Sequence, residues 1–168
     1  KDALQNGKRI NWERMIDTNV KGLLYVSEQI IPGMIARKSG HIINLSSTAG
    51  KETYPGGNVY CASKHAVIGW GESVRLEVEA IAQNLHVTTV TPSFINTEMF
   101  QGVRSPVIPL ADPIVAARKI INGVKKNKIY VRMPWIAYTV PFMKGILPQR
   151  WLDVIVGKWM GFHKSMDS

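Results

Sequence analysis

The sequence predicts an α/β fold built around a parallel β-sheet, and two observations lead to that prediction. Between residues 11 and 132, segments with helical periodicity alternate three times with short apolar runs, which is the order of elements in α/β domains. The short runs are apolar throughout rather than at every second position, as expected for strands that helices cover on both faces. With 168 residues, 45% hydrophobic and 20% charged, the chain has the balance of one globular domain.

The N-terminal part of the chain is predicted to form a long helix followed by a buried strand. Within residues 11–36 mostly apolar side chains recur at steps of three and four, and Asn19 lies in the same stripe. Pro32 falls inside this pattern and is expected to kink or shorten the end of the helix, which Lys38–Gly40 stops. Residues 41–46 are predicted to be the strand.

The remaining elements continue the alternation. Residues 47–57 are rich in Ser, Thr, Gly and Pro, which indicates a loop. Asp112 and Pro113 are a typical helix start, a cap followed by proline in the first turn. The other predicted elements are a helix at 59–83, with Ala62, Ala66, Trp70, Val74 and Val78 on one side, a strand at 86–91, a loop at 92–111, a helix to about Val124, a strand at 128–132 and short helices from Pro134.

Positive charge is concentrated in the second half of the chain. The formal net charge is +9, and residues 85–168 hold 11 Lys and Arg against 4 Asp and Glu. Such a half suits an anionic membrane surface or a phosphorylated ligand, and solvated surface lysines are the simpler interpretation. The lysines form no recognisable nucleic-acid-reading motif, so we expect no nucleic-acid partner.

Cysteine and histidine usage points to a reducing compartment and to a protein without metal. Cys61 is the single cysteine, which excludes an intramolecular disulfide, and we expect it to serve packing. The four histidines have no metal-ligand spacing. No signal peptide and no apolar run of about 18 residues is present. We therefore expect a cytoplasmic protein, with membrane association through the tail as the alternative.

Candidate chemistry lies after the first predicted strand and at the start of the next helix. In an open parallel sheet, ligands bind outside the carboxyl ends of the strands, where Ser46 and Ser47 are expected. Tyr60 and Lys64 share one helix face because they are four residues apart, and a cation beside a phenol stabilises the phenolate as a base. A Tyr-x-x-x-Lys spacing alone is a weak signal.

Four segments together are far more specific. They are Asn19–Gly22, Ile43–Ser47, Tyr60–Lys64 and Pro92–Thr97. In order and spacing the chain resembles the catalytic half of the short-chain dehydrogenase/reductase family over about residues 10–132. The resemblance implies the C-terminal portion of a Rossmann-like, doubly wound NAD(P)-binding domain over residues 1–132, followed by an extension at 133–168. It also implies an oxidoreductase that interconverts an alcohol and its carbonyl by hydride transfer with NAD or NADP.

The resemblance also implies roles for individual residues. Tyr60 is the general acid/base, and Lys64 supports it and binds the nicotinamide ribose. Asn19 and Tyr60 are also part of the cofactor-binding site. Ser47 holds the substrate oxygen, and Asn19 holds a water that links Lys64 to solvent. Residues of the segment after the strand at 86–91 contact the nicotinamide: Pro92, Ser93, Ile95 and Thr97. Ser93 stands where the family usually has glycine, which admits backbone angles and close approaches that serine resists.

One family feature is missing from the sequence. No glycine-rich turn follows a strand, although such a turn normally holds the cofactor pyrophosphate at a helix N-terminus. We therefore expect a partial chain, which on its own binds cofactor poorly or not at all. Its first strand is expected at an open edge of the sheet. The helices containing Asn19 and Tyr60 are, by the resemblance, the contact surfaces of a homo-oligomer.

The extension leaves several interpretations open. It interleaves aromatic and basic residues: Trp135, Phe142, Trp151, Trp159 and Phe162 with Lys144, Arg150, Lys158 and Lys164. Such a segment completes the core or a subunit contact, covers a lipophilic substrate, or contacts a membrane interface. Two other classes of function therefore stay open beside the enzyme, namely a catalytically silent fragment that only oligomerises and a peripheral membrane-binding module.

Overall fold

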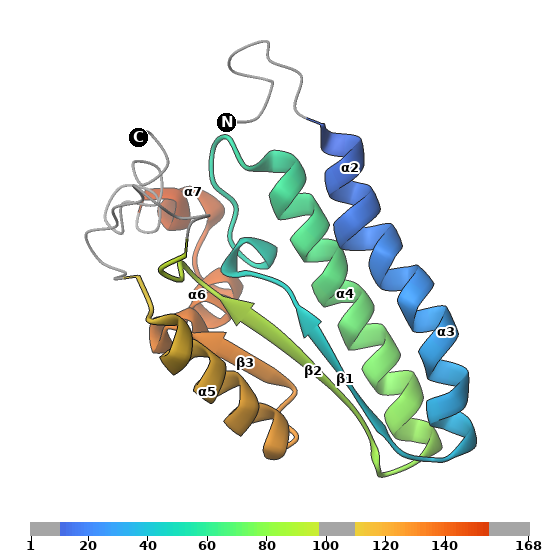
Figure 1. Cartoon of the computed structure of the whole chain (residues 1–168). Helices are drawn as coiled ribbons and strands as arrows, with labels where there is room; N and C mark the ends of the chain where they lie inside the picture. Colours follow the sequence, from blue (N-terminus) through green and yellow to red (C-terminus); the bar gives the residue numbers. More distant parts are fainter. Residues whose placement is uncertain (1–10, 98–109, 155–168) are drawn as a thin grey trace.

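The computed structural model describes residues 11–97 and 110–154, and its centre is a three-stranded parallel sheet (Figure 1). The strands are β1 (Gly40–Leu45), β2 (Leu85–Pro92) and β3 (Tyr130–Met133), hydrogen-bonded in that order. Helix α4 (Asn58–Ile81) connects β1 to β2, and helix α5 (Pro113–Lys125) lies between β2 and β3 in the chain. The predicted α/β fold with a parallel sheet is confirmed, and β1 lies at an edge of the sheet as expected.

The predicted N-terminal helix is one long rod made of three segments. They are α2 (Trp12–Ile16), the π-helical turn η1 (Asp17–Lys21) and α3 (Gly22–Ala36). Pro32 was expected to kink or shorten the helix, yet α3 continues through it for a further turn. The chain leaves the helix at Lys38, whose φ of 53° is left-handed. Its amide still bonds back to the Ile35 carbonyl at 3.0 Å.

Helices cover the two faces of the sheet unequally. The rod of α2, η1 and α3 lies beside α4 on one face, and α5 lies on the other (Figure 1). On the α4 face the core contains Met34, Ile42, Val78, Leu85 and Val87. On the α5 face it contains Val90, Ala116, Val131 and Met133. Register brings Val90 opposite both Leu45 and Val131.

Strand β1 departs from the expectation that both of its faces are covered. Ile43 and Leu45 remain 49% and 61% exposed, because α5 packs on β2 and β3. Ile42 and Asn44, on the other face, are buried against the helices. The apolar pattern of this segment therefore predicted a β-strand correctly, but it did not predict that helices pack on only one of its faces.

Helix α4 buries only part of the side that its sequence suggested: Val78 is in the core, and Trp70 and Val74 pack against it. Ala62 and Ala66 are exposed, whereas Val67, Ile68 and Gly71 are buried. Gly71 lets the helix approach the sheet closely, since a Cβ there would lie 2.8 Å from the Thr89 hydroxyl oxygen. Gly71 therefore lies in the contact between α4 and the sheet, whereas Ala62 and Ala66 lie on the exposed surface of the helix.

The described part of the extension forms short helices, as predicted. They are η4 (Trp135–Tyr138), α6 (Val140–Ile146) and α7 (Gln149–Leu152). Leu152 is buried, whereas Trp135, Phe142 and Trp151 are exposed. Trp159, Phe162 and their neighbouring lysines lie outside the described residues. Over residues 11–97 and 110–154, no helix is long and apolar enough to cross a bilayer.

Candidate active site

The candidate site lies where β1 and β2 end, beside the first turns of α4. The backbone amide of Ser46 bonds to the carbonyl of Val90 at 2.9 Å, which continues the strand pairing past β1. Ser47 Oγ lies 3.4 Å from the carbonyl oxygen of Pro92. The loop that carries the two serines is therefore fastened to the carboxyl end of the neighbouring strand, the position at which open parallel sheets bind ligands.

Ser47 begins a short turn that packs against α4. Its Oγ accepts a hydrogen bond from the Ala49 amide at 3.2 Å and thereby caps the 3₁₀ turn η2 (Thr48–Gly50). The buried hydroxyl of Ser46 donates to the carbonyl of Lys64 at 2.8 Å. Gly50 is required here, since a Cβ would lie 2.6 Å from that same carbonyl. The serine loop and α4 are thus in direct contact.

Tyr60 and Lys64 lie together on α4, as their spacing predicted. The Lys64 ammonium nitrogen lies 5.8 Å from the centre of the Tyr60 ring and donates a hydrogen bond to the Leu45 carbonyl at 3.1 Å. Burial lowers the pKa of Lys64 because it removes water from the ammonium group. For the same reason, the field of that charge at the neighbouring phenol is screened less than it would be in water.

Asn19 is tied to the turn that carries Tyr60 through a residue that the sequence reasoning missed. Its Nδ2 donates to Ser63 Oγ at 3.0 Å, and Ser63 Oγ donates to the carbonyl of Tyr60 at 2.8 Å. Ser63 is completely buried. The signal was available, since Ser63 lies one helical turn after Tyr60 and one residue before Lys64. The π-helical turn places Asn19 within η1, which packs on α4.

The segment after β2 lines an apolar cavity of about 230 Å³. Pro92, Ser93 and Ile95 are among its lining residues, whereas Thr97 is not among them and its hydroxyl donates to the Ile95 carbonyl at 3.4 Å. The Ser93 amide bonds to the Met133 carbonyl at 2.9 Å. Its φ is not left-handed, so serine at the family's glycine position needs no strained backbone.

Ser93 offers an unused polar group inside that cavity. Within the described ranges, its Oγ is buried and has no hydrogen-bond partner. Buried hydroxyls normally have a partner. The hydroxyl therefore fits a polar group of a bound molecule, such as the amide of a nicotinamide, beside apolar side chains that fit the ring.

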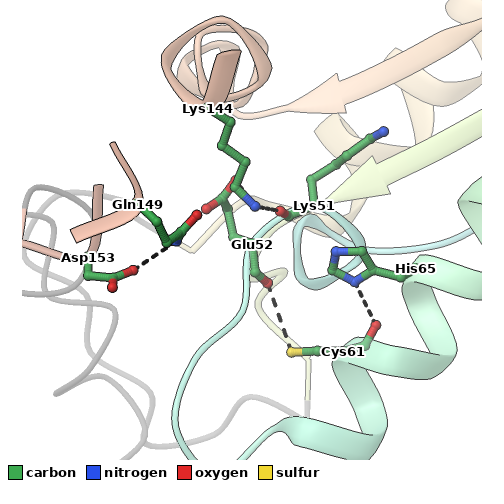
Figure 2. Close-up of polar contacts among 7 residues, drawn as sticks. All are labelled: Lys51, Glu52, Cys61, His65, Lys144, Gln149 and Asp153. Atoms are coloured by element: carbon green, nitrogen blue, oxygen red, sulfur yellow. Dashed lines mark hydrogen bonds and ion pairs between the residues drawn. The ribbon is translucent and has the colours of Figure 1, made fainter. Parts of the chain in front are cut away.

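Glu52 and Cys61 complete the surroundings of the serine loop. Glu52 is only 8% exposed, and its carbonyl accepts a hydrogen bond from the Cys61 thiol at a distance of 3.9 Å (Figure 2). Cys61 is buried, in agreement with a packing residue. The carboxylate of Glu52 pairs with Lys144 of α6, a partner that no sequence pattern indicated. In the part of the chain that the structure describes, no group of His, Cys, Asp and Glu side chains is arranged to hold a metal ion.

Comparison with known proteins finds similar sequences among dehydrogenases. The family model for short chain dehydrogenases matches residues 2–107. Epidermal retinol dehydrogenase 2 of Mus musculus is 36% identical over 156 residues, 90% of this chain and 50% of that protein. The Homo sapiens protein of the same name is 34% identical over 159 residues, 92% of this chain and 51% of its own length. The chain thus spans about half the length of these curated relatives.

Solved structures show the same fold. A short chain dehydrogenase from Burkholderia cenocepacia J2315 in complex with NADP superposes with a TM-score of 0.76 over 90% of this chain and 62% of that one, at 21% identity. Serine dehydrogenase from Escherichia coli superposes with a TM-score of 0.58 over 73% of this chain and 52% of that chain, at 35% identity. The first likeness is one of fold alone, because its sequence identity is low.

Proposed function

The chain belongs to the short-chain dehydrogenase family, and on this basis we propose that the protein is an oxidoreductase that interconverts an alcohol and its carbonyl with NAD or NADP. The observation that carries the proposal is the joint placement of Tyr60 and Lys64 on α4, beside the serine loop at the strand ends. Family membership supplies the reaction class. The site supplies groups of the right chemistry at the sheet edge where ligands bind.

Tyr60 is proposed to move the proton of the reaction. In the oxidation direction, the hydroxyl proton of the alcohol passes to the Tyr60 phenolate while the carbinol C–H bond breaks and its electron pair leaves with the hydrogen. A bound nicotinamide supplies the acceptor of that hydride. In the reduction direction, the Tyr60 hydroxyl returns the proton to the carbonyl oxygen. Lys64 places a poorly hydrated positive charge 5.8 Å from the centre of the Tyr60 ring.

Ser47 and Asn19 are proposed to position the reacting groups. Ser47 donates a hydrogen bond to the substrate oxygen and so stabilises the charge that develops there. Its Oγ now lies 3.4 Å from the Pro92 carbonyl, a long contact that such an oxygen would replace at little cost. Asn19 holds the Tyr60 turn through Ser63 and, by the family resemblance, a water that connects Lys64 with solvent.

The last residue of β2 and three residues after it are proposed to hold the nicotinamide: Pro92, Ser93, Ile95 and Thr97. Support comes from the cavity that the first three line, with its buried and unpartnered Ser93 hydroxyl. The choice between NAD and NADP remains open within this proposal. Both cofactors share the nicotinamide, which is the part that these residues would contact.

A lipophilic alcohol is the proposed substrate class. Two relatives that are 34–36% identical over most of this chain bear the name retinol dehydrogenase. The extension contributes exposed aromatic side chains, among them Trp135, Phe142 and Trp151. Large aromatic surfaces of this kind suit a lid over an apolar substrate.

The test is alcohol-dependent reduction of NAD and of NADP by the full-length protein. The panel compares long-chain and isoprenoid alcohols with ethanol and glycerol, and the Ser47→Ala variant controls for other dehydrogenases in the preparation. We expect turnover with lipophilic alcohols that falls at least about 100-fold in Ser47→Ala, as for loss of a donor to a developing oxyanion. Absence of turnover with every alcohol would contradict the proposal and favour a catalytically silent protein.

A homo-oligomer is proposed to form through the helices that contain Asn19 and Tyr60. The outer side of α3 exposes Leu24, Tyr25 and Val26 to solvent, which is apolar surface of the kind found at protein interfaces. Gel filtration of the protein and of Tyr25→Lys tests this. Elution of both proteins as the same monomer would contradict it.

Peripheral membrane contact is a second candidate, which one charge pattern favours. Residues 113–152 contain eight Lys and Arg and no Asp or Glu. A groove of about 310 Å³ between α5 and β3 is lined by Lys119, Lys126, Lys128 and Arg132, with Trp135 and Tyr138 at its side. Basic and aromatic side chains together suit the interface of an anionic bilayer. Co-sedimentation with phosphatidylserine vesicles that high salt abolishes would support the contact, and equal binding to neutral vesicles would contradict it.

A further inference from the structure

Lys144 of α6 joins the C-terminal extension to the segment that follows Ser47 (Figure 2). Its ammonium nitrogen lies 3.3 Å from Glu52 Oε1 and also donates a hydrogen bond to the backbone carbonyl of Lys51. Both side chains of the ion pair are largely shielded, with 32% and 11% of Lys144 and Glu52 exposed. Their attraction is therefore screened less by water and salt than that of a surface pair.

Lys144 opposes the effect that burial has on the Glu52 carboxyl. Burial raises the pKa of the Glu52 carboxyl, and the neighbouring Lys144 acts in the opposite direction. Glu52 Oε1 is buried and accepts no well-directed hydrogen bond within the described residues. Loss of the ammonium therefore removes the ion pair and the bond to the Lys51 carbonyl together, whereas loss of the carboxylate charge removes only the ion pair.

The turn that ends at Glu52 begins at Ser47. The amides of Lys51 and Glu52 both bond to the carbonyl of Thr48, at 2.9 and 2.8 Å, and the Gly50 amide bonds to the carbonyl of Ser47 at 3.0 Å. A turn closed by so many of its own hydrogen bonds moves as a unit. Displacement of Glu52 is therefore transmitted to Ser47.

The same turn is fastened to α4, the helix of Tyr60. Lys51 forms an ion pair with Glu72 at 3.6 Å, and the thiol of Cys61, next to Tyr60 in sequence, donates to the carbonyl of Glu52 at 3.9 Å. Glu72 is itself fixed, because it accepts a hydrogen bond from the Tyr130 hydroxyl of β3. The turn thus has anchors on α4 from one side and on α6 from the other, and Lys144 supplies the α6 anchor.

We propose that Lys144 and Glu52 are a positioning pair that sets the place of Ser47 relative to Tyr60, so that docking of α6 completes the active site. This inference rests on the proposed function, for which Ser47 and Tyr60 are the acting groups. Neither member of the pair touches the reacting atoms. Through this pair, the C-terminal extension would help to position Ser47, in addition to any role in covering the substrate.

The pair is tested by measuring kcat after substitution of its members in the wild-type protein and in the Ser47→Ala variant. Lys144→Met removes both contacts of the ammonium, and Glu52→Gln removes only the charge. We expect each to lower kcat about 10-fold or more in the full-length protein, because a small misplacement of a catalytic group is costly. In the Ser47→Ala background, Lys144→Met should change kcat by no more than about twofold, since residues that act as a unit are not additive.

Conservative and distant substitutions serve as controls. Lys144→Arg keeps the charge and should retain kcat to within about threefold of the wild type. Lys125→Met removes an equally long cation from the exposed last turn of α5 and should leave kcat unchanged. Equal kcat losses from Lys144→Met with and without Ser47 would overturn the proposal, because they would indicate a general structural role.

Hydrogen exchange gives a readout that does not need activity. In Glu52→Gln and in Lys144→Met, the amides of residues 48–52 and of α6 should exchange faster together, while those of α5 stay protected as in the wild type. Faster exchange in α6 with unchanged protection of 48–52 would overturn the inference. If the wild-type protein turns over no alcohol yet shows this joint exchange, the proposed function fails and the coupling between α6 and the turn stands.

Discussion

Replacing Gly71 with alanine tests how closely α4, the helix of Tyr60 and Lys64, packs on the sheet. A Cβ at Gly71 would lie 2.8 Å from Thr89 Oγ1 and 2.9 Å from Asn44 Nδ2. Both distances are shorter than carbon normally allows, and both neighbours are buried on strands. Forcing extra volume into a packed core typically costs about 1–3 kcal/mol.

Gly69 provides a matched control two residues earlier on the same helix. A Cβ there meets nothing within 4 Å, and the residue is exposed. Alanine in a helix interior is favoured over glycine by about 0.5–1 kcal/mol, and both variants receive this gain. Gly69→Ala should therefore be more stable than the wild type, and Gly71→Ala should lie about 1–3 kcal/mol below Gly69→Ala.

Urea unfolding followed by circular dichroism measures that difference. With similar dependence on urea in the two variants, the shift in midpoint reports the free energy of unfolding directly. Equal stabilisation by both substitutions, to within about 0.3 kcal/mol, would show that a methyl group fits at Gly71. It would mean that α4 stands farther from Asn44 and Thr89 than the structure has it.

Three further predictions concern the serine loop, a helix cap and pH. Gly50→Ala should lower stability by about 1–3 kcal/mol and lower kcat, because its Cβ would lie 2.6 Å from the Lys64 carbonyl; unchanged urea midpoint and turnover would contradict this. Asp112→Ala removes the acceptor of two α5 amides and should cost about 1 kcal/mol by the same assay, whereas Asp112→Asn should cost less. Burial, and then the charge of His86, lower the pKa of His41, so the unfolded chain binds more protons. Stability should therefore fall as pH drops below about 6.5, less so in His41→Asn, and equal pH dependence in both proteins would argue against it.

Elements with strong local patterns were predictable from the sequence. The helices at 11–36 and 59–83 and the three apolar strands appear in order, with boundaries displaced by at most two residues. Asn19 in an otherwise apolar stripe indicated that the residue faces protein, and it does contact Ser63. The spacing of Tyr60 and Lys64 likewise translated directly into a shared helix face.

Features that depend on distant parts of the chain were not predictable. The ion pair of Glu52 with Lys144 joins residues that no local pattern relates. The exposure of Ile43 and Leu45 depends on which elements cover β1. An apolar strand has the same sequence pattern whether one face or both faces are covered. The π-helical turn at Asp17–Lys21 is a shift in hydrogen bonding within a helix whose side-chain periodicity remains helical.

The most direct test of the central claim is the single-turnover rate of reduced nicotinamide formation in Tyr60→Phe. Phenylalanine keeps the ring beside Lys64 and removes only the hydroxyl that is proposed to exchange the proton. We expect a rate about 100- to 10,000-fold below that of the wild type, while Tyr25→Phe on the exposed side of α3 retains the full rate. A Tyr60→Phe protein that still reduces the cofactor at the wild-type rate would contradict the account.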